Sequence, residues 1–185
     1  PGTPALLTTS MKSVGEAMAI GRSFAEALQK GLRSMETGFS GLDPVEPPGD
    51  GGPDAFRAAL SQPSPDRLLM AAQAIRAGVS IEDIHNACKF DPWFLRELER
   101  IIAAERVVAL ARLTDAVGLD LVSVQDHPYQ PTFLETWTLL SVIAASTQSV
   151  RVVPNVANLP LRPPAVLARA AASLDLLSNG RVELG

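Results

Sequence analysis

Two clusters of polar residues stand at the ends of strand-like runs in the second half of the chain. Asp126 and His127 follow the β-prone run 119–124. The next run, 150–156, ends in a loop-like cluster made of Asn155, Val156, Ala157 and Asn158. Active sites of parallel β/α proteins are built at the carboxyl ends of strands, so these residues are the candidates for chemistry. A histidine placed there can hydrogen-bond or transfer a proton beside a reacting carbon.

Each cluster also has a purely structural interpretation. An aspartate at a strand end can cap the following turn, which would leave His127 as a solvated neighbour. Residues 155–158 can equally form an ordinary loop rich in turn-forming residues. The residues themselves leave both interpretations open.

Other residues that could do chemistry receive structural interpretations. His85 has Glu82 beside it but no third ligand at metal spacing, so no metal site is predicted. Trp93 and Phe94 stand just inside a helix start and are predicted to anchor a core. The glycines and charged residues of 12–22 match neither a phosphate loop nor a dinucleotide motif, which indicates a connector.

The first half of the chain has the sequence signals of helix starts. Capping residues or proline at the first turn predict helices that begin at Ser23, Ser64, Ser80 and Asp91. Residues 38–65 are rich in Gly, Pro and Asp, which predicts a long loop with one helical turn. We therefore predict an all-helical region over residues 1–103.

The second half alternates between helix-like and strand-like segments. The predicted order is helix, strand, helix, strand, helix and strand, over residues 104–117, 119–124, 133–147, 150–156, 165–177 and 181–184. Short links between such segments are typical of parallel βαβ units. The predicted fold class is α plus α/β, with a domain boundary between residues 103 and 104.

Composition excludes several classes of protein. Apolar residues make up 46% and charged residues 19%, with a net charge of -4, which is typical of a globular protein and argues against nucleic-acid binding. No apolar run reaches the length of a membrane span, and the single cysteine, Cys88, cannot form an internal disulfide. We expect a cytoplasmic protein with no membrane partner.

From residue 8 to about residue 102 the chain resembles the large subunit of carbamoyl-phosphate synthetase, an ATP-dependent ligase. The stretches that resemble it are residues 11–22 (MKSVGEAMAIGR), 78–84 (GVSIEDI) and 90–95 (FDPWFL). The resemblance implies the tail of an ATP-grasp unit followed by the helical oligomerisation domain. The catalytic residues of that family should lie before residue 1, so it implies a scaffold that binds no ATP.

From about residue 105 to residue 185 the chain resembles luciferase-like monooxygenases and related oxidoreductases that use FMN or F420. The motifs are residues 118–130 (GLDLVSVQDHPYQ), 155–162 (NVANLPLR) and 174–185 (LDLLSNGRVELG). The resemblance implies a partial (β/α) TIM-barrel fragment, from the first helix to the start of the fourth strand. It also implies that Asp126 and His127 line the cofactor ring, and that residues 155–158 form a bulge or strained peptide against it.

We predict a mosaic of the two families that is not catalytically competent alone. The resemblance implies FMN or F420, but we expect neither to bind this fragment, because a barrel site gathers groups from several strand ends. Open sheet edges predict self-association. Two alternatives stay open: an oxidoreductase fragment that needs the barrel remainder, and a chimeric or artefactual fusion without selected function. Whether the chain is an enzyme stays open with them.

Overall fold

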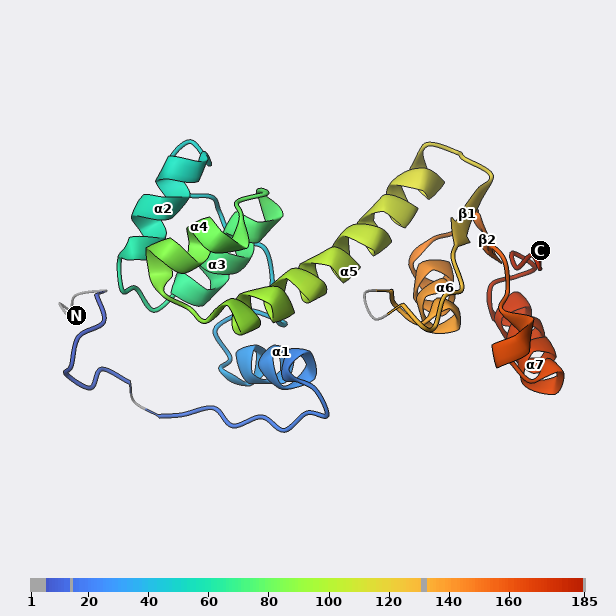
Figure 1. Cartoon of the computed structure of the whole chain (residues 1–185), viewed down its shortest axis with the longest axis horizontal. Coiled ribbons are helices and arrows are strands. Elements are labelled where there is room, and N and C mark those ends of the chain that lie inside the picture. Colours follow the sequence, from blue (N-terminus) through green and yellow to red (C-terminus); the bar gives the residue numbers. More distant parts are fainter. Residues whose placement is uncertain (1–5, 14, 131–132, 185) are drawn as a thin grey trace. The chain divides into compact units, whose positions relative to one another are not determined.

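The computed structural model describes residues 6–13, 15–130 and 133–184. Contacts between residues divide the chain into two compact units, Pro1–Ala103 and Ala104–Gly185. Figure 1 labels the helices and strands of both units. Each unit has its own hydrophobic core.

The first unit is helical. Its helices are α1 (Phe24–Ser34), α2 (Pro53–Ser61), α3 (Arg67–Arg76), α4 (Ile81–Cys88) and the beginning of α5 (Pro92–Ala116). The side chain of Ser23 accepts a hydrogen bond from the backbone N–H of Glu26, and Ser80 does the same for Asp83. These two predicted caps are confirmed, since each satisfies an N–H that the first turn leaves free.

Two helix boundaries differ from the prediction. Helix α2 has nine residues where only one helical turn in a loop was expected. Its Pro53 occupies the first turn, and its Phe56 is fully buried, so tertiary packing outweighs the Gly- and Pro-rich surroundings. Helix α3 begins at Arg67 instead of following Ser64, whose carbonyl accepts a hydrogen bond from the Arg67 N–H in the preceding turn.

The core of the first unit lies where α2, α3 and α4 meet, as these helices contact one another in Figure 1. Helix α5 contributes Leu95, Leu98 and Ile102, all buried and spaced along one face. The prediction that Trp93 and Phe94 anchor the core is wrong, because their side chains are 47% and 46% exposed. The face of α5 that contains Leu95 takes the core position instead.

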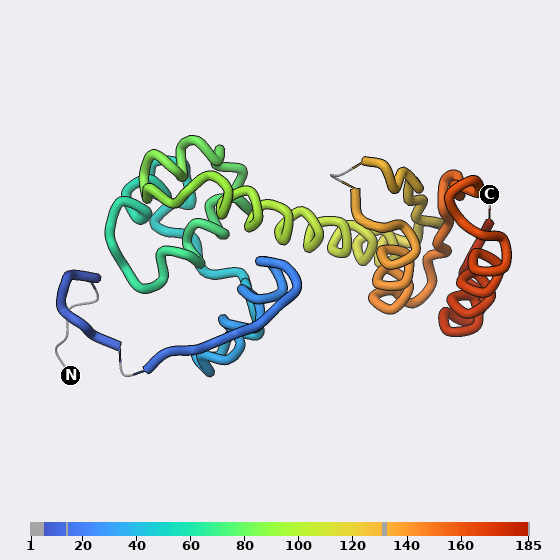
Figure 2. Tube along the Cα trace, turned by 60° about the horizontal axis from the view of Figure 1, so that its bottom comes forward, coloured from blue at the N-terminus to red at the C-terminus, as the bar shows by residue number. Residues whose placement is uncertain are grey.

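A connector without regular secondary structure precedes α1. Residues 15–21 are assigned to neither helix nor strand, and Figure 2 traces them as a tube leading to α1. The Lys30 ammonium of α1 donates a hydrogen bond to the carbonyl of Ile20 and forms an ion pair with Glu26. Helix α1 therefore holds the last part of this connector.

The second unit alternates strands and helices along the chain. After the end of α5 come β1 (Leu121–Val124), α6 (Thr136–Ser146), β2 (Arg151–Pro154), the 3-10 turn η1 (Leu159–Leu161) and α7 (Pro164–Leu177). The two strands pair in parallel, with Leu121 opposite Arg151 and Val124 opposite Pro154. The predicted strand at 181–184 is reduced to one parallel bridge between Val152 and Val182. The described sheet is therefore small and open.

The core of the second unit forms between the sheet and its helices. Val152 of β2 is fully buried against Leu140 and Ile143 of α6, with Leu174 of α7 in the same cluster. Ala111 places one face of α5 in this core. Among the described residues, no helix combines the length and apolarity needed to cross a bilayer.

A carboxylate ties α5 to the start of β2. Asp115 accepts hydrogen bonds from the backbone N–H groups of Gln148, Ser149 and Val150, at 2.7, 2.8 and 2.6 Å. These N–H donors lower the pKa of Asp115 below its ordinary value. The contact fixes the amino end of β2, which leaves the opposite end of the strands for the candidate site.

Candidate functional site

The candidate residues meet at the carboxyl ends of β1 and β2. Parallel pairing places both ends at one edge of the sheet, and the Asn155 N–H donates to the carbonyl of Val124 at 2.8 Å. Asp126 and His127 lie just after β1, and residues 155–158 lie just after β2. We call Asp126, His127 and residues 155–158 together the strand-end site.

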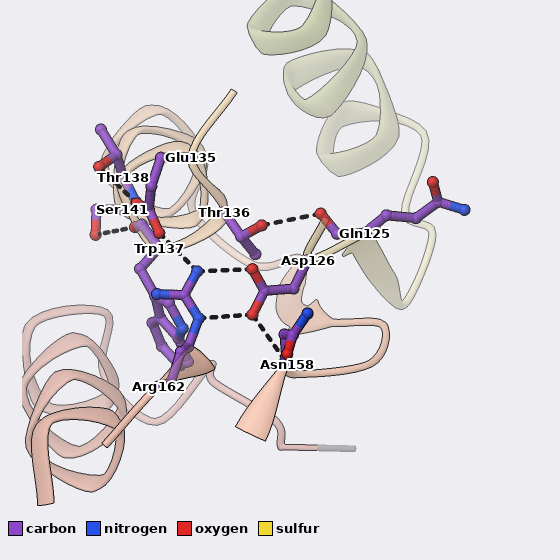
Figure 3. A network of polar contacts seen from close by, with 9 residues as sticks. All are labelled: Gln125, Asp126, Glu135, Thr136, Trp137, Thr138, Ser141, Asn158 and Arg162. Atoms are coloured by element: carbon purple, nitrogen blue, oxygen red, sulfur yellow. Dashed lines mark hydrogen bonds and ion pairs between the residues drawn. The ribbon is translucent and has the colours of Figure 1, made fainter. Parts of the chain in front are cut away.

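Asp126 is buried and fully engaged. Its side chain is 1% exposed and forms a two-pronged ion pair with Arg162, with oxygen distances of 2.6 Å to Nε and 2.7 Å to Nη2. The Asn158 N–H also donates to Asp126, at 2.9 Å. Figure 3 shows the guanidinium facing both carboxylate oxygens. Such two-pronged pairs are among the stronger hydrogen-bonded contacts in proteins.

Arg162 sets the charge state of this site. Its hydrogen bonds lower the pKa of Asp126 from 3.8 to about 2, although burial acts in the opposite direction. The pKa of Arg162 is raised in turn, first by the Asp126 carboxylate. Asp126 is therefore an ionised hydrogen-bond acceptor near neutral pH, which makes it a poor group for taking or giving a proton.

A second carboxylate shares the guanidinium. Glu135 lies 2.7 Å from Arg162 Nη2, and its other oxygen accepts from the Thr138 N–H, which caps α6. Burial works against ionisation of Glu135, but these hydrogen bonds lower its pKa overall. Beside it, the Thr136 hydroxyl donates to the carbonyl of Gln125 at 2.9 Å, as Figure 3 shows. The start of α6 is thus joined to the end of β1.

The loop after β2 is held at two points. The Asn155 N–H extends the sheet ladder, and the Asn158 N–H reaches Asp126. The peptide bond between Asn155 and Val156 is cis. The Val156 side chain is largely exposed, while Ala157 packs against the core of the second unit. The structure therefore brings Asp126 and Asn158 together and leaves Val156 facing solvent.

His127 belongs to a small aromatic group. Its Nδ1 lies 2.6 Å from the Tyr129 hydroxyl, and its ring centroid is 5.3 Å from that of Tyr129 and 6.0 Å from that of Phe133. The hydroxyl can donate to a neutral imidazole, which would leave the other ring nitrogen as a donor. Because Asp126 is fixed as an anion, His127 is the residue of the strand-end site suited to proton transfer.

Three residues of this neighbourhood were not assigned a role from sequence. Arg162 is part of the motif at residues 155–162, and Tyr129 is part of the motif at residues 118–130. Glu135 lies near the start of the helix expected at residues 133–147. One signal could have identified Arg162: it is a basic residue shortly after the second strand, and parallel pairing brings that strand end beside Asp126. Within the described residues, no group of three or more His, Cys, Asp and Glu side chains could hold a metal ion.

Comparisons with known proteins match two overlapping parts of the chain to different families. The model of the carbamoyl-phosphate synthetase large chain oligomerisation domain matches residues 16–123, and that of luciferase-like monooxygenases matches residues 88–185. The carbamoyl phosphate synthase large chain of Mesorhizobium japonicum is 52% identical over 133 residues, covering 66% of this chain and 11% of that protein.

The corresponding large chain of Rhizobium meliloti is 56% identical over 110 residues, covering 57% of this chain and 9% of that protein. A third, from Brucella melitensis biotype 1, is 54% identical over 109 residues, which again is 9% of its length. The chain thus spans about a tenth of the length of these curated relatives.

Proposed function

Because the chain belongs both to the carbamoyl-phosphate synthetase large-chain oligomerisation-domain family and to the luciferase-like monooxygenase family, we propose that it is a self-associating assembly module. In this proposal its luciferase-like part is an incomplete TIM barrel that catalyses no reaction alone. The boundary between the two domains lies between residues 103 and 104. The buried free thiol of Cys88 fits a reducing compartment, which supports a cytoplasmic location.

The observation that supports self-association is an exposed aromatic cluster on the helical unit. We call Phe24, Trp93 and Phe94 the aromatic trio; their ring centroids lie 4.9 to 5.4 Å apart. Trp93 and Phe94 leave about half of their surface exposed at the start of α5. Aromatic side chains of this kind are enriched at protein interfaces, where burial of their rings stabilises the complex. The trio is our candidate for the contact between two copies.

Light scattering at tens of micromolar, the range in which exposed apolar surfaces associate, tests this contact. We expect a dimer or larger species for the natural chain. The double variant Trp93→Ser, Phe94→Ser should dissociate, because it removes the apolar surface while leaving the buried Leu95 in place. The matched control is Leu176→Ser, which changes an exposed leucine of the other unit. A natural chain that is monomeric at that concentration contradicts the proposal.

The proposed lack of catalysis is supported by the charge balance at the strand-end site. Flavin-type cofactors bear phosphate, and proteins hold phosphate with free cationic groups or helix N-termini. The guanidinium that lies at this site, that of Arg162, is already bonded to Asp126 and Glu135. An incoming phosphate would have to compete with two carboxylates for it.

A second candidate function is that of an FMN- or F420-dependent oxidoreductase part that becomes active when the remaining barrel is supplied. The convergence of His127, Asp126 and residues 155–158 at one sheet edge favours it. In this reading residues 155–158 lie against the cofactor ring and His127 transfers a proton beside it. The third possibility is a fusion without selected function. It predicts no self-association, and no oxidoreductase activity when the remaining barrel is supplied.

A further inference from the structure

One guanidinium joins three separate segments of the second unit. Arg162 follows η1 in the chain, Asp126 follows β1, and Glu135 precedes α6. Arg162 and Asp126 are 36 positions apart, and Arg162 and Glu135 are 27 apart. The Arg162 side chain is mostly buried, with about a fifth of its surface exposed. Long-range charged contacts of this kind hold loops that lack a hydrogen-bond ladder of their own.

The loop of the strand-end site depends on this guanidinium through Asp126. The Asn158 N–H donates to Oδ2 of Asp126, the same oxygen that receives Arg162 Nε. Without Arg162 the buried carboxylate would lose its counter-charge, and it would move toward water or become protonated. Either change would weaken its bond to Asn158. The hydrogen bond from the Asn155 N–H to the carbonyl of Val124 would still tie the start of the loop to β1.

We propose that Arg162 is the positioning residue of the strand-end site. By holding the Asp126 carboxylate against the Asn158 N–H, it fixes residues 155–158 at the end of β1 before any ligand arrives. In the second candidate function, where the remaining barrel is supplied, the ligand at this site is a planar, flavin-like ring, and this identification rests on that candidate function. In this role Arg162 preorganises the loop and does not itself hold the cofactor's phosphate.

Three variants test the role of Arg162 without any cofactor. Arg162→Gln removes the charge, and Arg162→Lys keeps the charge but loses the two-pronged geometry. The matched control is Arg151→Gln, because Arg151 forms an exposed ion pair with Glu183 in the same unit. Hydrogen exchange at the amides of Asn155 and Asn158, and titration of the Asp126 carboxyl group, are followed by NMR in each protein.

In Arg162→Gln we expect exchange at Asn158 to become at least about tenfold faster, a modest effect for the loss of a buried charged contact. In that variant the pKa of the Asp126 carboxyl should rise to the ordinary range of aspartate or above it, because burial then acts without the opposing guanidinium. Arg162→Lys should change the exchange rate at Asn158 and the pKa of Asp126 less than Arg162→Gln does. Arg151→Gln should change neither quantity. The titration separates this role from general destabilisation, which would speed exchange throughout the unit.

Unchanged exchange at Asn158 in Arg162→Gln would overturn the inference, whether or not the titration shifts. If that variant does not fold, Arg162→Lys decides: exchange and titration equal to those of the natural chain would equally contradict the role. These readings involve no flavin. Tight binding of a flavin by the natural chain would contradict the proposed lack of catalytic competence, yet it would leave this inference intact.

Discussion

Asp126 makes the second unit sensitive to acid. Its folded-state pKa of about 2 lies below the ordinary value of 3.8, so the unfolded chain binds the proton more tightly. The stabilisation from this group is complete above about pH 5 and is lost as the pH falls toward 2. The difference in pKa corresponds to a stabilisation on the order of 2 kcal/mol.

Chemical denaturation followed between pH 7 and pH 2 measures this effect. We expect the free energy of unfolding of the natural chain to fall across the acid range, and Asp126→Asn to flatten that part of the curve. Asp120→Asn is the matched control, because Asp120 is an exposed aspartate at the other end of β1. Equal acid sensitivity in the natural chain and Asp126→Asn would show that another group is responsible.

The sequence located part of the site and missed its organising residue. Asp126 and His127 could be found because a strand-like run ends just before them. Arg162 was not assigned as their partner, since the pairing spans 36 positions and depends on how the two strands pair. Whether His127 and residues 155–158 contact a cofactor stays a prediction.

At the scale of elements, α2 is the helix whose packing should matter most in the first unit. Phe56 is fully buried, whereas Trp93 of α5 is about half exposed. Phe56→Ala should lower the free energy of unfolding by about 3 to 5 kcal/mol, because it removes a buried ring and leaves a cavity. The control Trp93→Ala should cost clearly less. Similar losses in urea denaturation would contradict this description of the core.

Local sequence signals predicted where helices start and the order of the strands. They did not predict the exact lengths of these elements. Ser23 and Ser80 cap helices as predicted, because capping depends on a few neighbouring residues. Helix α2 was missed because its stability comes from tertiary contacts of Phe56 and Leu60. The last predicted strand is a single bridge at Val182, and a bridge cannot be distinguished from a strand by composition.

At the scale of the whole molecule, both family resemblances predicted from sequence are confirmed. The two family matches overlap over residues 88–123, and most of that overlap is α5. This 25-residue helix crosses the boundary between the two units without a break. Its first part contributes Leu95 and Leu98 to one core, and Ala111 contributes to the other. The end of one family match and the beginning of the other therefore both include this helix.

The most direct test of the proposed function is a fluorescence titration of the natural chain with FMN and, separately, with F420. We expect no saturable binding in the micromolar range, because the guanidinium at the strand-end site is already neutralised by two carboxylates. A dissociation constant of about one micromolar or tighter, equal to roughly -8 kcal/mol, that His127→Ala abolishes would contradict the account. It would show that the strand-end site is a working flavin site in this chain.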